Sequence, residues 1–178
     1  MIAGAHAVLW VRQDALGNDA CRFADAEGGY LIDGSATDSE WNIQRYRIRA
    51  RANGSTRRAR LGVTSRIIIR RTSGGKWSVN DTPMPDVTGA FDIDLGFTPA
   101  TITLPIRRLK LAVGAQADLT LAHYDAASQT LKPLHQTLHR TAKDTYTLTN
   151  PATGTSDQLK VNKHNIVQDY TGRWMAQK

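Results

Sequence analysis

The alternation between positions 45 and 51 restricts most strongly what this chain can fold into. Every second residue there is arginine, and the residues between them are Tyr46, Ile48 and Ala50. A period of two is typical of a β-strand with one face on a core and one face in solvent. The same alternation recurs along the chain, and strong helical periodicity is absent. The sequence therefore predicts a mainly β protein.

Turn signals separate the alternating runs at short intervals: Gly28-Gly29, Asn53-Gly54, Ser73-Gly74-Gly75 and Asn150-Pro151. This spacing is typical of an all-β roll, barrel or sandwich. Thr82-Pro83-Met84-Pro85 is predicted to be a surface loop, because proline interrupts strand ladders. We expect one domain over residues 1–178. The predicted strands are His6–Arg12, Cys21–Ala24, Tyr30–Ala36, Trp41–Ala52, Ser55–Val63, Ser65–Arg71, Lys76–Val79, Gly89–Leu95, Arg107–Val113, Asp118–Tyr124, Lys132–Arg140, Asp144–Thr149, Ser156–Asn162 and His164–Tyr170.

One segment could be helical. Thr98 is a plausible N-cap and Pro99 a plausible first helical residue. Pro105 would then end or kink the helix. The β-branched run from Thr101 to Thr103 argues against a helix, so the residues alone leave both structures open.

The composition is that of a globular protein, with 40% hydrophobic and 22% charged residues among 178. No apolar run approaches the ~18 residues that span a membrane, and the first residues lack the basic region of a secretory signal. Cys21 is the single cysteine, which excludes an intrachain disulfide and a cysteine zinc cluster. A cytoplasmic location fits these features best.

Positive charge is concentrated in one part of the chain. The stretch from Trp41 to Lys76 holds eleven Lys or Arg and no Asp or Glu, leaving twelve bases and sixteen acids elsewhere. Such asymmetry often marks a binding surface, and it can also mark two parts of a protein that neutralise each other.

The dipeptide Asn53-Gly54 predicts a hairpin with a two-residue turn. In that register Arg51 opposes Thr56, Arg49 opposes Arg58, and Arg47 opposes Arg60. The predicted basic face comprises Arg45, Arg47, Arg49, Arg51, Arg58 and Arg60, and the opposite face, turned to the core, comprises Tyr46, Ile48, Ala50, Ala59 and Leu61.

Like charges that oppose each other in a sheet repel, so this basic face needs counterions. The protein's own carboxylates, a partner chain or an anionic ligand could supply them, and the first two fit the acidic remainder of the chain best. Nucleic acid is a weaker candidate, because the face lacks aromatic side chains for base stacking and the chain has no nucleic-acid-binding motif.

Other motifs carry little chemistry. His135 and His139 are four residues apart but lack the glutamate of a metalloprotease motif, and we expect surface histidines and no metal site. Cys21 is expected to be a small core residue. Asp92 and Asp94 share one face of a predicted strand and could act as an acid and base pair or bind sugar hydroxyls. Alternatively they form a polar face, with Arg107 and Arg108 as partners.

The run Phe91-Asp92-Ile93-Asp94-Leu95-Gly96-Phe97-Thr98-Pro99-Ala100-Thr101-Ile102-Thr103-Leu104-Pro105-Ile106-Arg107-Arg108-Leu109 resembles a bacterial family described as putative glycolipid-binding proteins. Gly75-Lys76-Trp77, Val167-Gln168-Asp169-Tyr170, and Trp10 followed by Leu16-Gly17-Asn18-Asp19 extend the resemblance over nearly the whole chain.

The resemblance implies a many-stranded antiparallel β-roll or open barrel wrapped around a single short α-helix, and a homodimer. It also implies an acidic pocket for a glycolipid or sugar. Trp77 and Tyr170 would offer flat surfaces to the ligand, Arg107 and Arg108 would lie nearby, and Arg108 would orient a carboxylate. The acids that it places near the pocket are Asp19, Asp92, Asp94 and Asp169.

Three functional hypotheses remain. The first is a non-catalytic binding protein for a glycolipid or related amphipathic ligand, with an apolar pocket that carries a few polar groups, no cofactor and no catalytic residue. The second is an enzyme of glycolipid or sugar metabolism that uses Asp92 and Asp94, which requires both to face a cleft. The third is an interaction protein that binds an anionic partner or nucleic acid through the basic face.

Overall fold

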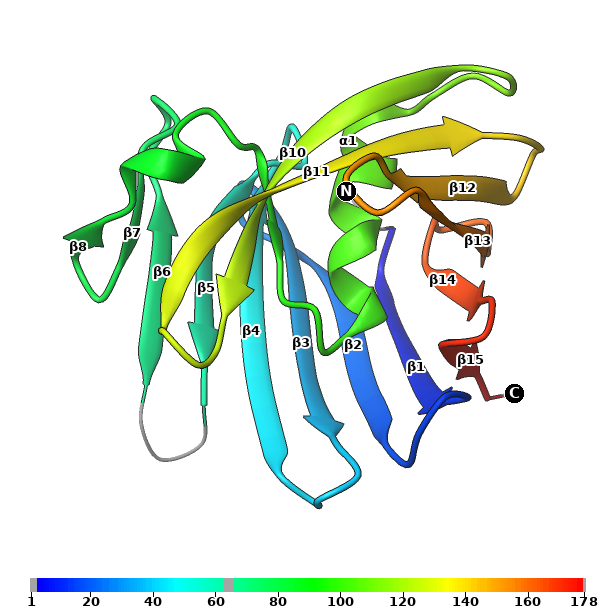
Figure 1. Ribbon diagram of the computed structural model, residues 1–178, viewed down its shortest axis with the longest axis horizontal. Coiled ribbons are helices and arrows are strands. Elements are labelled where there is room, and N and C mark those ends of the chain that lie inside the picture. Colours follow the sequence, from blue (N-terminus) through cyan, green and yellow to red (C-terminus); the bar gives the residue numbers. More distant parts are fainter. Residues whose placement is uncertain (1–2, 63–65, 178) are drawn as a thin grey trace.

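The computed structural model describes residues 3–62 and 66–177. Within them fifteen strands form one continuous sheet (Figure 1), and successive strands are mostly neighbours. The strands from β2 to β8 follow one another on one side, those from β10 to β15 follow one another on the other side, and β1 pairs with β15 to join the two sides. The sheet ends at β8 and β9 and is not closed into a barrel, so the prediction of a mainly β open roll is confirmed.

The strands extend over β1 Ala5–Arg12, β2 Asn18–Ala26, β3 Gly29–Thr37, β4 Ile43–Arg51, β5 Thr56–Leu61, β6 Ile67–Arg71, β7 Trp77–Val79, β8 Thr82–Pro83, β9 Asp92–Asp94, β10 Gln116–Asp125, β11 Thr130–Arg140, β12 Thr145–Asn150, β13 Thr155–Val161, β14 Val167–Tyr170 and β15 Trp174–Ala176. A short 3-10 helix η1 covers Pro85–Val87, and a second, η2 at Pro99–Ile102, leads directly into the helix α1 at Thr103–Leu109. The prediction missed β15, and Thr82–Pro83 forms a two-residue edge strand where a loop was expected.

The helical segment fills the hollow of the sheet (Figure 1). Thr98 caps η2, because its side chain accepts a hydrogen bond from the Ala100 amide. Leu104 and Ile106 are buried in the core of the roll. Their burial outweighs the β-branched run before them, so a segment with mixed local preferences becomes helical.

Two predictions for this segment are wrong. Pro105 does not stop the helix, because it lies in the first turn of α1, where a missing N–H costs little. The predicted strand Arg107–Val113 is helical as far as Leu109, and Lys110 ends the helix with a left-handed φ of 49°.

The β4–β5 hairpin confirms the two central pairs, Arg47 with Arg60 and Arg49 with Arg58. The turn itself differs from the prediction. The Gly54 amide donates to the Arg51 carbonyl at 2.8 Å, which centres the turn one residue earlier, and Gly54 takes a φ of +89°. A bulge at Arg57 then restores the register, since Ala50, and not Arg51, opposes Thr56.

The edge strand β9 runs parallel to β10, whereas the other described strand pairs are antiparallel. It also reaches the first half of the sheet, because Thr56 donates its amide to the Phe91 carbonyl at 2.9 Å and accepts the Ile93 amide at 3.0 Å. Val63 and Ser65, the ends of two predicted strands, lie outside the described residues. No described helix has the length and apolarity needed to cross a membrane.

Candidate functional site

A cleft of about 240 Å³ lies between the start of η2 and the strands of the second half of the sheet. Its lining mixes carboxylate, amide, hydroxyl and apolar side chains. The lining residues are Asp94, Gly96, Thr98, Pro99, Thr101, Ile102, His123, Leu134, Gln136, Leu148, Asn150, Thr155, Asp157, Tyr170, Arg173 and Trp174. We call it the end cleft.

Asp94 and His123 form a polar pair on one wall of the end cleft. They are neighbours because the parallel pairing of β9 and β10 places them in register. The Oδ2 atom of Asp94 lies 2.6 Å from Nδ1 of His123, and its Oδ1 atom accepts the hydroxyl of Thr101 at 3.2 Å. The hydrogen bond with Asp94 raises the pKa of His123 above its ordinary value.

Asp157 and Tyr170 lie on the adjacent strands β13 and β14. The Tyr170 hydroxyl donates to Oδ2 of Asp157 at 3.1 Å, and Arg173 forms an ion pair with the same oxygen at 3.3 Å. The Arg173 guanidinium also lies over the Tyr170 ring, 5.3 Å from its centroid. Burial, followed by the charge of Asp157, raises the pKa of the Tyr170 phenol, so the phenol keeps its proton at neutral pH.

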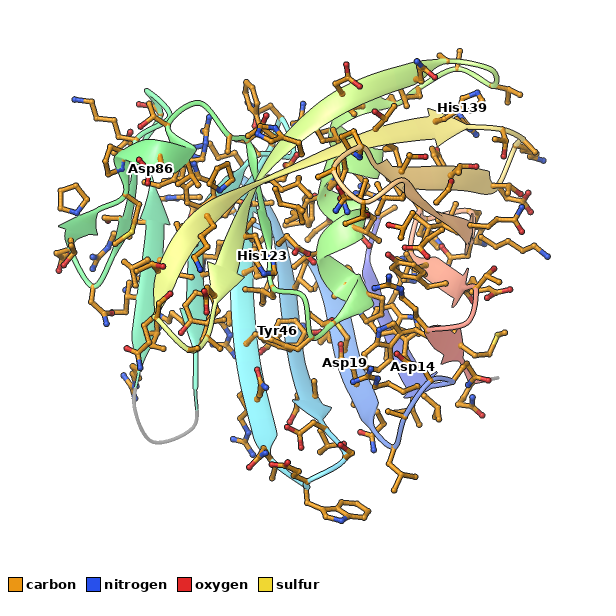
Figure 2. All side chains as sticks on the ribbon, viewed as in Figure 1. Asp14, Asp19, Tyr46, Asp86, His123 and His139 are labelled. Carbon is orange, nitrogen blue, oxygen red and sulfur yellow. The ribbon has the colours of Figure 1, made fainter. Side chains whose placement is uncertain are left out.

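Asp19 lies behind Thr98 and does not line the end cleft. Its side chain is fully buried, and its Oδ2 atom accepts hydroxyls from Thr98 at 2.5 Å and Tyr46 at 2.7 Å. Its Oδ1 atom has no partner among the described residues. Burial raises the pKa of Asp19, against the effect of the two hydroxyls. Figure 2 marks Asp19 on β2, Tyr46 on β4 and His123 on β10.

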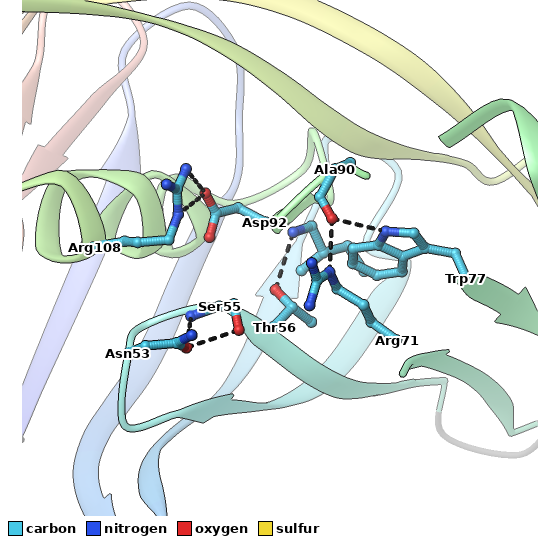
Figure 3. A network of polar contacts seen from close by, with 9 residues as sticks. Asn53, Ser55, Thr56, Arg71, Trp77, Ala90, Asp92 and Arg108 are labelled. Carbon is cyan, nitrogen blue, oxygen red and sulfur yellow. Dashed lines mark hydrogen bonds and ion pairs between the residues drawn. The ribbon is translucent and has the colours of Figure 1, made fainter. Parts of the chain in front are cut away.

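Asp92 is fully buried at the far end of the helix from Asp19. Arg108 donates from Nε at 3.0 Å and from Nη2 at 2.7 Å to its Oδ2 atom (Figure 3). The guanidiniums of Arg108 and Arg71 both lie over the Phe91 ring, 4.7 and 4.9 Å from its centroid. This network fixes the start of β9 and leaves Asp92 no access to the end cleft.

Three further residues of the predicted site lie outside the end cleft. Trp77 is buried and donates its indole N–H to the Ala90 carbonyl at 3.0 Å, so its ring faces offer no open surface. Arg107 donates to the His164 carbonyl at 2.8 Å. Asp169 lies opposite Lys160 on β13. Of the eight predicted ligand-binding residues, the structure brings Asp94 and Tyr170 together in the end cleft.

The predicted basic face is on the outside of the β4–β5 hairpin. The residues predicted to face the core, Tyr46, Ile48, Ala50, Ala59 and Leu61, are all buried. Arg45, Arg47, Arg49 and Arg60 are exposed, and Arg58 is partly buried. Arg51 differs, because its guanidinium donates to the carbonyls of Thr56 at 2.5 Å and Arg71 at 2.6 Å.

The other residues that the sequence singled out lie outside the end cleft. Cys21 is buried in the core, as predicted. His135 is exposed and lies 3.2 Å from the hydroxyl of Thr120, while His139 is partly buried. In the described part of the chain, no group of three or more His, Cys, Asp or Glu could hold a metal ion.

The sequence pattern did not indicate four of the cleft residues, His123, Asp157, Arg173 and Thr98, or the position of Arg57 on the basic face. For Thr98 the signal was the predicted N-cap. The others had no local signal, because pairing between distant strands brings them to their positions.

The chain matches a family model and a solved structure. A family model described as "Putative glycolipid-binding" matches residues 7–176. The crystal structure of a DUF1089 family protein from Pseudomonas aeruginosa matches with a TM-score of 0.69 and 24% identity, over 97% of this chain and 92% of that chain. It shows the same fold. A search of the curated proteins finds no match.

Proposed function

Because the chain belongs to the family described as "Putative glycolipid-binding", we propose that it is a non-catalytic protein that binds the sugar headgroup of a glycolipid in the end cleft. The observation that carries the proposal is the mixed lining of this cleft. Sugar rings present hydroxyl groups at their rim and C–H groups on their faces, so they need polar and apolar contacts from one site.

The polar contacts come from groups with free hydrogen-bonding capacity. A carboxylate has about four acceptor positions, and Asp94 and Asp157 each use only part of theirs on His123, Thr101, Tyr170 and Arg173. The amides of Gln136 and Asn150 add donors and acceptors. The apolar contacts come from Ile102, Leu134 and Leu148.

The size of the end cleft favours a headgroup over a whole lipid. Its volume of about 240 Å³ is slightly below the range of roughly 300–1,000 Å³ for pockets that enclose a small organic ligand. The hollow of the sheet is filled by the helix and by buried side chains such as Leu104, Ile106 and Leu138. The acyl chains of the ligand therefore stay outside the roll, and the lining is more polar than the sequence predicted.

The position of the two predicted acids supports binding over catalysis. A pair of carboxylates that shares acid and base work must face one cleft. Asp94 lines the end cleft, but Asp92 is fully buried and held by Arg108. The two carboxylates therefore do not face one cleft, which the enzymatic hypothesis based on these residues requires.

The family resemblance also predicts a homodimer, and one outer surface supports this. Leu9 on β1 and Met175 on β15 are 43% and 38% exposed. Val11 and Met175 are direct partners across the two strands, so Leu9, Val11 and Met175 share the outer face. Sedimentation equilibrium of the wild type and of Leu9→Glu tests this surface, and a monomeric wild type would contradict it.

The test of the proposed function is binding to lipids that differ only in the headgroup. Nanodiscs with a monoglycosyl diacylglycerol are compared with nanodiscs that carry the sugar-free diacylglycerol, and native mass spectrometry of protein from its own host looks for a co-purified glycolipid. We expect sugar-dependent binding. Asp157→Asn should weaken it by about tenfold, the usual effect of losing hydrogen bonds to a charged group.

The matched control is Asp118→Asn. Asp118 is an exposed carboxylate on β10 that accepts the Thr137 hydroxyl at 2.7 Å and lies outside the end cleft. This variant should bind the glycolipid as the wild type does. Equal binding of both lipids by the wild type, or equal loss in both variants, would contradict the proposal.

A further inference from the structure

A second cavity, of about 290 Å³, lies on the outer surface of the sheet and is lined entirely by arginine. Its lining residues are Arg47, Arg49, Arg57, Arg58 and Arg60, from β4 and β5. The end cleft contains none of them. Because Tyr46, Ile48 and Ala59 turn into the core, strand alternation directs the arginines outward, away from the helix and the end cleft. We call this cavity the arginine cavity.

The register brings the arginines close together. Arg49 opposes Arg58, Arg47 opposes Arg60, and Arg58 also opposes Arg70 on the next strand, β6. The bulge adds Arg57, which has no direct partner on β4 and would point inward in a regular strand. Bulges often redirect a side chain at a binding site. Here the bulge adds a fifth guanidinium to the cavity.

The protein's own carboxylates neutralise little of this charge. Asp33 pairs with Arg47 at 2.5 Å, and Asp81 pairs with Arg70 at the rim. In the described part of the chain, no carboxylate forms an ion pair with Arg49, Arg57, Arg58 or Arg60. Of the two sources that the sequence favours, the protein's own carboxylates therefore neutralise only part of the basic face, and counterions from a partner chain stay a prediction.

Arg58 lies between arginines on both neighbouring strands, because it opposes Arg49 on β4 and Arg70 on β6. Its Nε atom is buried and has no hydrogen-bond partner among the residues that the structure describes. Burial lowers the pKa of Arg58, and the charges of Arg60, Arg70 and Arg49 lower it further. A buried, unpaired donor among like charges is unfavourable unless an acceptor completes it.

We propose that the arginine cavity is a binding site for a compact phosphate anion, either a soluble pyrophosphate-like group or the phosphate of a lipid headgroup. The planar guanidinium fork matches phosphate oxygens two at a time. Several guanidinium groups around one small volume are best neutralised by an anion with many acceptor oxygens and more than one negative charge. A single carboxylate has only two oxygens and one negative charge.

The test is isothermal titration calorimetry with pyrophosphate in a phosphate-free buffer. Arg49→Gln and Arg58→Gln, from opposite strands, should each weaken binding by about tenfold, because each removes charge-assisted hydrogen bonds. Arg58→Lys should bind between the wild type and Arg58→Gln, since it keeps the charge but loses the fork. Thermal unfolding of each variant establishes that it is folded.

The matched control is Arg22→Gln. Arg22 is an exposed arginine on β2, a strand that does not line the arginine cavity. This variant changes the net charge equally, and its affinity should stay within about twofold of the wild type. A loss as large as that of Arg58→Gln would mean that general charge attracts the anion, and this would overturn the proposal.

Two further arms identify the source of the phosphate. Vesicles of phosphatidylglycerol and of phosphatidylcholine are sedimented with the protein, with pyrophosphate as competitor. Binding to phosphatidylglycerol that Arg58→Gln weakens and that pyrophosphate displaces assigns the site to a lipid headgroup, and binding of pyrophosphate alone assigns it to a soluble anion. The proposal is overturned if neither probe binds, or if duplex DNA is the one anion whose binding depends on these arginines.

Discussion

The two ends of the central helical segment are each held by a buried aspartate, and the two aspartates are held in different ways. At the start, Asp19 accepts hydroxyls from Thr98 and Tyr46, and at the end Asp92 accepts both donors of the Arg108 fork. Both carboxylates are 0% exposed, and each has one oxygen without a partner in the described residues.

The difference shows two ways in which a buried carboxylate can be stabilised. Asp92 keeps a compensating cation, so the pair is stable as long as both partners remain. Burial raises the pKa of both carboxylates, but at Asp92 the charge and hydrogen bonds of Arg108 oppose the rise, whereas Asp19 has only neutral donors. The rigid end with the ion pair fixes β9 against β5, whereas the end with neutral donors lies directly behind Thr98 in the wall of the end cleft.

Removing the cation at the rigid end should have the largest effect. Arg108→Met leaves Asp92 buried without a partner, and we expect a loss of about 3–5 kcal/mol in the free energy of unfolding. Urea unfolding measures it. Asp92→Asn combined with Arg108→Met should recover part of the loss, because no charge then remains buried.

An exposed ion pair provides the control for this change. Lys132 pairs with Asp125 at 2.5 Å, and the lysine side chain is 62% exposed. Lys132→Met should cost less than about 1 kcal/mol. Equal losses in Arg108→Met and Lys132→Met would show that burial does not distinguish the two pairs.

Displacing Tyr46, a hydroxyl donor to Asp19, should have the next largest effect on the free energy of unfolding. A Cβ atom at Gly34 would lie 2.3 Å from Cζ and Oη of Tyr46. Gly34→Ala must therefore displace the ring that donates to Asp19, and we expect a loss of about 1–3 kcal/mol, typical of overpacking. Gly74→Ala is the control, because its Cβ would meet only the Thr72 hydroxyl at 3.9 Å. A neutral Gly34→Ala would mean that the Tyr46 ring relaxes without cost.

For the two ends, the sequence predicted the elements and, as one alternative, a pairing of Asp92 with Arg108, but it did not predict the contacts of Asp19. Alternation predicted β4 and its faces, and the Thr-Pro pair predicted the cap at Thr98, because these signals lie within a few residues. The bond between Thr98 and Asp19 joins residues 79 positions apart, and the one between Asp94 and His123 joins residues 29 apart. Such contacts depend on strand order and on a parallel pairing, which local periodicity does not encode.

The same reasoning explains the error at the arginine hairpin. Asn53-Gly54 favours a two-residue turn, but the Asn53 side chain accepts the Ser55 amide at 3.0 Å and the Ser55 hydroxyl at 2.8 Å. These bonds stabilise the earlier turn that leaves Gly54 at positive φ. Side-chain bonds of this kind compete with the strand ladder, and the bulge at Arg57 follows from them.

The pH dependence of Asp19 should have a smaller effect. Its pKa in the folded chain is above the ordinary value of 3.8, so the folded chain keeps a proton that the unfolded chain releases. Stability should fall as pH rises from about 4 through the raised pKa, by at most about 1.4 kcal/mol per pH unit. Asp19→Asn should reduce this slope in urea unfolding across pH, and the part that comes from Asp92, whose pKa burial also raises, should remain. A titration of the Asp19 carboxyl carbon by NMR is the independent check, and an ordinary pKa there would contradict the expectation.

The smallest effect is expected at the partly exposed pair in the end cleft. Asp94 raises the pKa of His123 above 6.5, so the stabilisation is complete below pH 6.5 and is lost as pH rises through the raised value. The side chains of His123 and Asp94 are 36% and 20% exposed, so solvent screening should keep this stabilisation below about 1 kcal/mol.

In NMR titrations of the His123 ring, Asp94→Asn should lower the pKa towards 6.5, whereas Thr101→Val, which leaves the Asp94–His123 contact in place, should shift the pKa less. Equal shifts in both variants would mean that Thr101, and not the carboxylate charge alone, determines the proton affinity of His123. The effect of the Asp94 carboxylate in the open cleft would then depend on the hydroxyl of Thr101, as the Asp19 carboxylate in the core depends on the hydroxyls of Thr98 and Tyr46.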